Sequence, residues 1–430
     1  MKNLSTLFQA ICLVALPLWA GAQTQLLSTP NASQKASVSQ TVGLTDMEVI
    51  YHRPMVNKRE VWGKLVPYGQ VWRAGANDNT TITFSTDVMV EGQPLAAGTY
   101  GLHMIPNEKD CTVIFSKNNS AWGSFSYNPA EDALRVPAKL TAADHFYEYL
   151  TYDFEGVSAD AATCMLSWGD KSIPFQVKVD LENTVVPSIR HQLQNKAGFS
   201  WQGWNEAANF CLQNDFNHQE ALTWATRSVF IQPTPQNMLV KARLTGKVNN
   251  PGNEAEAKKT VFATLDQDLQ TFPTTWREYH AAATYATQQE NWEKAVSWEQ
   301  KSVDMSPNMT NMMALSGVWS KKGDETKAKK MKADALARGS NTELNNYGYQ
   351  LLGQGNMAEA IEVFEMNTKK NPTDPNVWDS LGEGYFNNNQ KDKAAEAFKK
   401  SLSLNPPANV KANSLKFLEA MGVKADTIKP

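Results

Sequence analysis

Residues 375–408 read PNVWDSLGEGYFNNNQKDKAAEAFKKSLSLNPPA, and this stretch decides the fold of the C-terminal half of the chain. Bulky apolar residues, small residues and a proline hold fixed positions in it: Trp378, Leu381, Gly382, Tyr385, Ala394, Phe398 and Pro406. The preceding 34 residues repeat the pattern in the same register: Leu344, Tyr347, Gly348, Leu351, Ala360, Phe364 and Pro372. Small residues let two helices approach closely, and proline ends the second helix because it lacks a backbone donor. The sequence therefore predicts one helical hairpin written twice.

The two copies resemble the tetratricopeptide repeat, a helical hairpin that stacks on its neighbours to form a solenoid. Weaker copies between residues 201 and 340 bring the expected number of hairpins to six. Val410 to Met421 would be the capping helix, so the repeat region is expected to span residues 201–421. The resemblance implies that the concave face of the solenoid binds a protein or peptide partner.

The residues of this binding groove are expected on the first helix of each hairpin. In the last two units they are Asn345, Tyr349, Asp379, Glu383, Phe386 and Asn387, and the unit that begins at residue 276 contributes His280, Thr284 and Gln288. Two of these side chains are carboxylates, which would repel the C-terminal carboxylate of a peptide. A basic or amide-rich segment is therefore the expected partner. The alternative is that these residues are ordinary solvated surface.

The first 22 residues have the features of a signal peptide. Lys2 supplies the charged start, Leu7 to Trp19 form an apolar run, and Ala20-Gly21-Ala22 is a small-residue cleavage site. No later run approaches the ~20 apolar residues of a transmembrane helix. We therefore expect an exported protein, located in the periplasm of a Gram-negative bacterium.

The charge of the chain is almost balanced, with 41 basic and 44 acidic residues and a formal net charge of −3. This composition has no basic stripe of the kind that binds nucleic acid, so we expect no nucleic-acid partner. Aromatic residues make up 10% of the chain, which favours packed cores over disorder.

Between residues 34 and 181 the pattern changes to short alternating or β-branched runs separated by turn residues. This pattern predicts an all-β sandwich or jelly-roll-like domain, followed by a linker helix at 182–200. Cys111 and Cys164 lie in two of the predicted strands. In an oxidising compartment they could form a disulfide, or they could be two separate buried thiols.

Several short motifs follow one another in the β region: Arg53-Pro54, Pro67-Tyr68-Gly69, Trp72-Arg73-Ala74-Gly75-Ala76-Asn77 and Ala97-Gly98-Thr99-Tyr100. In this order they resemble the exported bacterial family called domain of unknown function 2911, over about residues 33–179. Members of that family often carry tetratricopeptide repeats after the domain. The resemblance implies a fold and a location, and it implies no chemistry.

The same motifs contain rings, planar cations and an amide that could form a ligand site in the β domain. The candidate residues are Arg53, Trp62, Tyr68, Trp72, Arg73, Asn77 and Trp122. Rings stack on the apolar faces of sugars, and arginine and asparagine bond hydroxyls or carboxylates in fixed geometry, which points to a glycan or a carboxylate. The alternative is that the tryptophans fill the sandwich while Arg73 pairs with Asp78 or caps carbonyls. The β domain would then be only a structural platform.

The sequence contains few signs of a catalytic site. None of its six histidines has the spacing of a paired metal ligand, and no glycine loop of the phosphate-binding type is present, so we expect neither metal nor cofactor. A hydrolase site in which His52 or His103 meets a carboxylate would not show in spacing. We therefore expect an exported binding or scaffold protein, with a hydrolase of this kind as the alternative.

Overall fold

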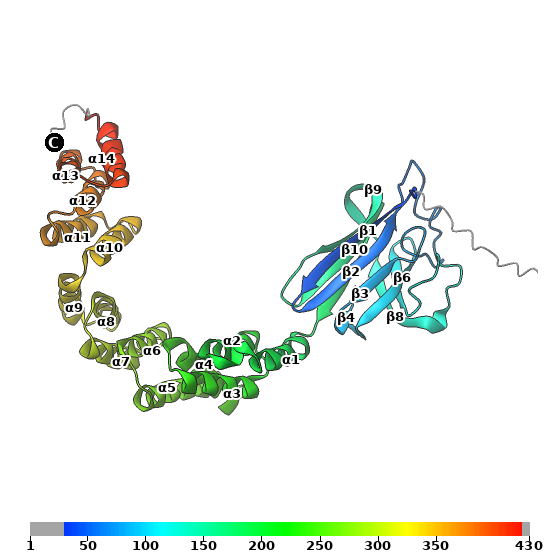
Figure 1. Cartoon of the computed structure of the whole chain (residues 1–430), viewed down its shortest axis with the longest axis horizontal. Coiled ribbons are helices and arrows are strands. Elements are labelled where there is room, and N and C mark those ends of the chain that lie inside the picture. The colour runs from blue at the N-terminus through cyan, green and yellow to red at the C-terminus, as the bar shows by residue number, and fades with distance from the viewer. Residues whose placement is uncertain (1–29, 424–430) are drawn as a thin grey trace, which may run out of the picture. The chain divides into compact units, whose positions relative to one another are not determined.

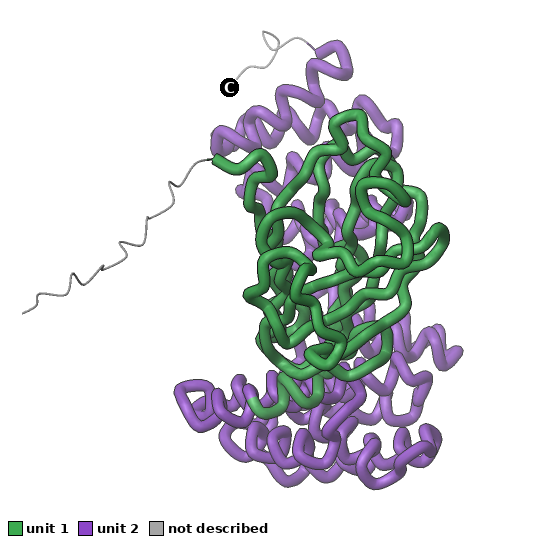
Figure 2. The backbone as a smooth tube through the Cα atoms, turned by 90° about the vertical axis from the view of Figure 1, so that its right-hand side faces the viewer, with its two compact units in different colours: residues 1–187 green, residues 188–430 purple. Residues whose placement is uncertain are grey.

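The computed structural model describes residues 30–423. The predicted signal peptide, residues 1–22, lies outside this range. The chain divides into two compact units, residues 1–187 and residues 188–430, which Figure 2 shows in green and purple. The first unit is all β apart from short helical segments, and the second is all α, so the predicted fold class is confirmed.

The first unit contains two antiparallel sheets (Figure 1). The six-stranded sheet has the order β1-β2-β3-β6-β7-β8, and the four-stranded sheet has the order β5-β4-β10-β9. The strands are β1 (Gln34–Val42), β2 (Thr45–Arg53), β3 (Thr81–Phe84), β4 (Val88–Val90), β5 (Gln93–Leu95), β6 (Gly98–Pro106), β7 (Asp110–Ser116), β8 (Asp132–Lys139), β9 (Thr141–Glu155) and β10 (Ala161–Val179).

The core of the first unit lies between its two sheets. In β2, alternate residues Met47, Val49 and Tyr51 are buried while Asp46 is exposed, which is the period of two that a half-buried strand requires. Phe115 of β7 and Phe175 of β10 meet edge to face with ring centroids 5.8 Å apart. This contact joins the six-stranded sheet to the four-stranded one.

A connection without regular strands runs from β2 to β3, residues 54–80. Single β-bridges attach it to the sheets and to a second loop: Met55 to Tyr149, Trp72 to Met104 and Asp78 to Trp122. The dense motifs of the sequence lie in this segment, so their placement depends on these bridges.

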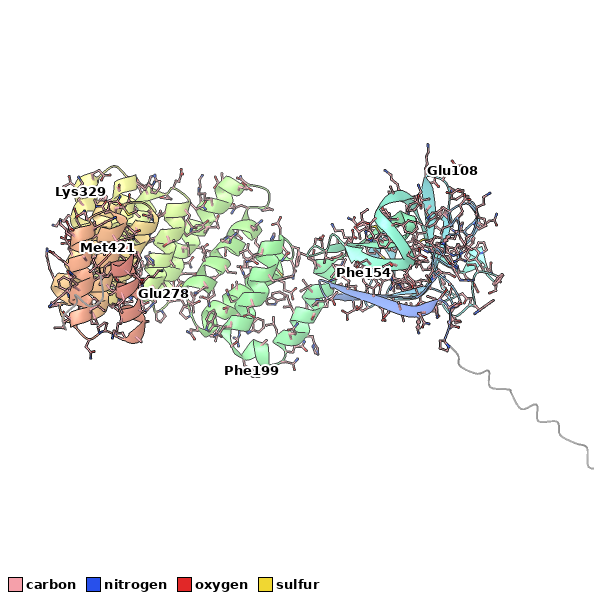
Figure 3. The ribbon with its side chains drawn as sticks, turned by 90° about the horizontal axis from the view of Figure 1, so that it is seen from above. Glu108, Phe154, Phe199, Glu278, Lys329 and Met421 are labelled. Carbon is pink, nitrogen blue, oxygen red and sulfur yellow. The ribbon has the colours of Figure 1, made fainter. Side chains whose placement is uncertain are left out.

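Helix α1 (Leu181–Leu193) and a short 3-10 helix (Lys196–Phe199) connect the sandwich to the repeats. They cover most of the segment where a linker helix was predicted. Phe199, labelled in Figure 3, ends this connection just before the first repeat helix.

The second unit consists of six hairpins and a final helix within the described residues (Figure 1). The hairpins are α2 (Trp201–Asn214) with α3 (His218–Ile231), α4 (Pro235–Asn249) with α5 (Glu254–Thr271), α6 (Trp276–Gln288) with α7 (Trp292–Met305), α8 (Met309–Lys321) with α9 (Glu325–Arg338), α10 (Asn341–Gly353) with α11 (Met357–Lys370), and α12 (Pro375–Asn387) with α13 (Lys391–Ser403). Helix α14 (Ala408–Ala420) follows as the cap.

The helices begin where the sequence supplies side-chain caps. At the start of α6, Thr275 and Glu278 form a capping box, in which the Glu278 carboxylate accepts the backbone N–H of Thr275 at 2.7 Å. Figure 3 labels Glu278. Reciprocal boxes of this kind also start α4, α8 and α10, so the first helix begins with a capping box in four of the six hairpins.

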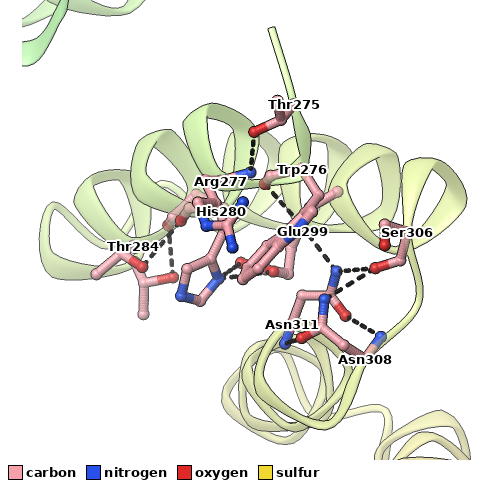
Figure 4. A network of polar contacts seen from close by, with 12 residues as sticks. Thr275, Trp276, Arg277, His280, Thr284, Glu299, Ser306, Asn308 and Asn311 are labelled. Atoms are coloured by element: carbon pink, nitrogen blue, oxygen red, sulfur yellow. Dashed lines mark hydrogen bonds and ion pairs between the residues drawn. The ribbon is translucent and has the colours of Figure 1, made fainter. Parts of the chain in front are cut away.

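A buried polar junction, which the repeat pattern does not predict, recurs between hairpins. Asn237 Nδ2 donates to Ser228 Oγ at 2.9 Å and to the Gln232 carbonyl at 2.8 Å, and Ser228 Oγ donates to the Trp201 carbonyl at 2.8 Å. The third and fourth hairpins carry the same junction: Asn311 Nδ2 donates to Ser302 Oγ at 3.1 Å and to the Ser306 carbonyl at 3.0 Å, and Ser302 Oγ donates to the Trp276 carbonyl at 2.9 Å. Figure 4 labels Asn311, Ser306 and Trp276 of this junction. Fully bonded buried networks fix one packing arrangement, so these junctions set how one hairpin stacks on the next.

Candidate binding sites

The predicted carboxylates of the last hairpin, Asp379 and Glu383, accept hydrogen bonds from the capping helix α14. Asp379 is 4% exposed and accepts hydrogen bonds from Ser414 Oγ and, at 2.8 Å, from Asn413 Nδ2. Asn413 also donates to Glu383 Oε1 at 2.6 Å. Burial raises the pKa of both Asp379 and Glu383, against the lowering effect of these bonds. The acidic pair therefore joins α12 to α14.

The other predicted groove residues of the last two units lie around this pair and are also engaged. Tyr349 Oη donates to Glu383 Oε1 at 3.2 Å, and Asn387 Nδ2 donates to the Glu383 carbonyl at 2.8 Å. Phe386 packs edge to face on Phe417 of the cap at 4.9 Å. Asn345 differs, because its Oδ1 is buried without a partner among the described residues. The structure thus brings most of this set together as a junction with the cap.

A cavity of about 320 Å³ opens where the third and fourth hairpins meet. Two of its lining residues, Thr284 and Gln288 on α6, belong to the predicted groove set. Helix α7 contributes Glu299, and α8 contributes Gly317 and Lys321. The first helices α6 and α8 are neighbours, so the cavity lies between groove helices.

The carboxylate of Glu299 is the buried polar group of this cavity. Glu299 is 1% exposed, and His280 Nδ1 lies 2.9 and 3.0 Å from its two oxygens (Figure 4). Burial raises the pKa of the Glu299 carboxyl, and the bond to His280 lowers it. A carboxylate offers about four acceptor positions, and one ring N–H does not fill them. The Glu299 carboxylate therefore has acceptor capacity beyond its bond to His280, and Lys321 is the other charged residue of the cavity lining.

A larger cavity of about 1190 Å³ lies among the first three hairpins, near their turns. Its lining includes Arg243, Lys247 and Lys258. Lys247 forms an ion pair with Asp215, and Lys258 Nζ donates to the Gln289 carbonyl at 3.1 Å. These residues were absent from the predicted groove, because the first two units match the repeat pattern weakly and gave no register from which to place them.

Five of the seven predicted ligand residues of the β domain have structural partners. Trp62 Nε1 donates to the Trp168 carbonyl at 3.1 Å, and Trp72 stacks on Trp168 with ring centroids 6.0 Å apart. Asn77 Nδ2 donates to the Ser33 carbonyl at 3.2 Å. The remaining two are Arg53, which donates to Leu150 and Thr151, and Tyr68, whose ring packs beside Gly63.

The other two predicted residues, Arg73 and Trp122, come together at the surface of the sandwich. Trp122 is 65% exposed and stacks on Phe125. A Cβ on Gly123 would lie 2.8 Å from Arg73 Nη1, so the guanidinium rests against the backbone beside Trp122. Sequence spacing missed Phe125 and Gly123.

The histidines of the alternative hydrolase are buried in the sandwich. His52 Nε2 lies 3.9 Å from Asp78 Oδ2, and His103 Nδ1 lies 3.0 Å from Ser124 Oγ. Burial lowers the pKa of His103 to about 4. A general base is most effective with a pKa near the working pH, so His103 is poorly matched to that role near pH 7.

Cys111 and Cys164 are buried thiols and are not bridged to each other. Burial raises the pKa of Cys111 to about 12 and raises that of Cys164 further. The described residues contain no group of three or more His, Cys, Asp or Glu side chains that could hold a metal ion. Across the same range, no helix is long and apolar enough to cross a membrane.

Comparison with known families agrees with both halves of the structure. Residues 33–177 match the family model described as "Protein of unknown function (DUF2911)", and residues 375–408 match the model described as "Tetratricopeptide repeat". The chain carries a DUF2911 domain followed by tetratricopeptide repeats. The resemblance predicted from the sequence motifs is confirmed in identity and order. No curated protein matches the chain significantly.

Three solved structures are similar to part of the chain. The APC/C hetero-tetramer Cut9-Hcn1 is 16% identical over 56% of this chain and 46% of that chain, with a TM-score of 0.26, so less than half of its length is covered. YrrB, described as a TPR protein with an unusual peptide-binding site, is 13% identical over 53% and 96%, with a TM-score of 0.21. MamA is 13% identical over 48% and 92%, with a TM-score of 0.22.

Proposed function

We propose that this protein is an exported, periplasmic scaffold whose repeats hold a segment of a partner protein. The match to the tetratricopeptide repeat supports the interaction role, and the signal-peptide features of residues 1–22 support export. The DUF2911 domain would be a second recognition module, with a glycan as its ligand. Peptide mass spectrometry of the chain from a periplasmic fraction tests the location, and the expected N-terminal residue is Gln23, as glutamine or as its cyclised pyroglutamyl form.

The observation that carries this proposal is the cavity between α6, α7 and α8, with the Glu299 carboxylate buried beside it. Most of the lining is apolar or uncharged: Thr284, Thr287, Gln288, Ala314, Gly317 and Val318. A lysine or arginine side chain has an apolar stem and a cationic tip, so it can fill such a cavity and bond a carboxylate inside it. The partner segment would therefore place one basic side chain in this cavity.

The last two units would contribute little to charge recognition. Their carboxylates already accept bonds from Asn413 and Ser414 of the cap, and a partner would have to break those bonds to use them. The expectation of a basic segment is thus kept, and its site is moved from the last hairpin to the third and fourth.

The experiment that tests this function is selection of peptides from a random display library on the mature chain, followed by fluorescence polarisation. We expect the selected peptides to share a Lys or Arg at one position. Glu299→Gln keeps an acceptor for His280 but removes the charge, so the preference for that basic residue should disappear. Glu293→Gln, an exposed change on the same helix, is the matched control.

A second variant separates binding from folding. A Cβ on Gly317 would meet no atom within 4 Å, and Gly317 lines the cavity, so a leucine there should extend into it. Replacing a glycine inside a helix is stabilising by about 1 kcal/mol. Gly317→Leu should therefore fold at least as well as the wild type and bind the peptides at least tenfold more weakly. Unchanged binding by this variant would exclude the cavity as the docking site.

A further inference from the structure

Two loops that are far apart in the sequence meet at one place on the sandwich. The first is residues 72–79 of the β2–β3 connection, and the second is residues 117–128 between β7 and β8. Asp78 and Trp122 form a single antiparallel β-bridge, and the Asn79 N–H donates to the Ala121 carbonyl at 3.2 Å. We call this place the loop junction.

The first loop is held in one conformation by its own hydrogen bonds. Trp72 Nε1 donates to the Gly75 carbonyl at 3.2 Å, and the Ala74 carbonyl accepts from Thr80 Oγ1 at 3.2 Å and from Tyr152 Oη at 2.9 Å. Ala74 has a φ of 50°, a conformation that a residue with a Cβ adopts only when its surroundings impose it. The backbone of the loop is therefore held in one conformation before any ligand arrives.

Arg73 is the exception within this bonded loop. Across residues 30–423 no acceptor bonds its guanidinium, and its Nε is buried without a partner. Burial lowers the pKa of Arg73, and no opposite charge offsets that effect. A buried polar group without a partner costs free energy, and one that persists in a native structure requires an explanation. The nearest explanation is an anionic group that binds there.

Aromatic rings lie next to this unpaired cation. A Cβ on Gly123 would lie 2.8 Å from Arg73 Nη1 and 3.2 Å from two ring carbons of Phe125, so the guanidinium and the ring approach the same point. Trp122 and Phe125 stack with centroids 5.7 Å apart and planes 18° apart, and they are 65% and 81% exposed. Two large exposed rings stacked on each other form a platform that is costly to leave in water.

We infer that the loop junction binds a carboxylate-bearing sugar, such as a uronic acid unit of a glycan. The Arg73 guanidinium supplies a planar fork that matches a carboxylate, and the Trp122–Phe125 platform supplies a flat apolar surface for the face of a sugar ring. A simple carboxylate would not need the platform, and a neutral sugar would not need the cation. This inference rests on the proposed role of the DUF2911 domain as a recognition module, and it is independent of the peptide groove.

The test uses the full mature chain and isothermal titration calorimetry. The probes are trigalacturonate and a hyaluronan tetrasaccharide, each beside its carboxyl-reduced neutral form, together with sodium acetate. We expect at least one acidic oligosaccharide to bind at least tenfold more tightly than its neutral form, with no binding of acetate. A charged hydrogen-bonded contact of about 1.5–3 kcal/mol corresponds to about tenfold or more in affinity.

Three variants assign the contacts. Arg73→Met and Trp122→Ala should each weaken binding of that oligosaccharide at least tenfold, while Phe146→Ala should leave it unchanged. Phe146 is a suitable control because it is a 59% exposed aromatic residue of the same domain. Trp122 is also exposed, so its truncation keeps the test decisive even if Arg73→Met were to fold poorly.

The inference is overturned if none of the acidic probes binds, if a neutral form binds as tightly as its acidic parent, or if acetate competes for the site at similar concentration. Retention of binding by Arg73→Met would also overturn it. Neither support for this inference nor its failure bears on the proposed peptide groove. That proposal is tested separately, with peptides and with variants of the third and fourth hairpins.

Discussion

Arg53 and Arg73 provide a matched pair whose replacement by methionine should have opposite consequences for stability. Methionine keeps an apolar stem at both positions and removes only the guanidinium. Arg53 Nε donates to the Leu150 carbonyl at 3.0 Å, and its Nη2 donates to Thr151 Oγ1 at 2.7 Å. Hydrogen bonds to charged groups contribute about 1.5–3 kcal/mol each, so Arg53→Met should cost about 2–4 kcal/mol after allowance for partial exposure. These bonds join β2 to β9, so the loss should appear in both strands.

Arg73 has no such bonds within the described residues, and its burial carries a desolvation cost that no partner repays. Arg73→Met should therefore leave stability within about 0.5 kcal/mol of the wild type or raise it. The assay is hydrogen exchange by mass spectrometry on peptides from β2 and β9 of the mature chain, since it reports local free energies of opening in a protein with two units. If Arg73→Met costs as much as Arg53→Met, then Arg73 has a structural partner and the reasoning behind the ligand site fails.

Three further outcomes are expected. Gly382→Ala should destabilise the last hairpin by about 1–2 kcal/mol, because the new Cβ would lie 2.7–2.8 Å from three ring carbons of the buried Phe398. Gly317→Ala meets open space and should stabilise its helix by about 1 kcal/mol. Hydrogen exchange that changes in the same direction in both variants would contradict this. Ser414→Ala should cost about 1–3 kcal/mol by removing a donor from the buried Asp379, measured as faster exchange in α14, and unchanged exchange would show that the bond contributes nothing. Finally, the pKa of His103 is about 4 in the folded state and 6.5 when unperturbed, so the unfolded chain takes up the proton first; stability of the sandwich should fall as pH drops from 6.5 to 4, by about 1.4 kcal/mol per unit, and a flat urea midpoint across this window would refute it.

The repeat half of the structure could be predicted in detail because its signal is periodic. The 34-residue register locates both helices of each of the last two hairpins, and the capping helix continues the same register. Asn413 stands 34 residues after Asp379, at the equivalent position of an incomplete unit, and it bonds that carboxylate. Extending the register past residue 408 would have shown that the acidic pair has a neighbour in the cap.

The site in the β domain could be predicted only as a set of residue types. Arg53 and Arg73 stand in the same dense run, and nothing local distinguishes them. The partners of Arg53 lie 97 and 98 residues further along the chain, on a strand of the other sheet. Which arginine is left without a partner therefore depends on the closed sandwich, and the residues that complete the site, Gly123 and Phe125, come from a loop that no motif marks.

A departure from the repeat pattern indicates the groove site more sharply than the pattern itself does. Phe364 and Phe398 hold the same position in the two well-matched units, and both are fully buried in the seam of their hairpins. In the unit that begins at residue 276 the equivalent residue is Glu299, which is just as buried. A carboxylate in a seam position loses the apolar contacts of a phenylalanine and carries a desolvation cost that one bond to His280 only partly offsets. The third hairpin therefore has a buried charge beside an open cavity where the well-matched units have a packed phenylalanine. A basic side chain of a partner would recognise this charge.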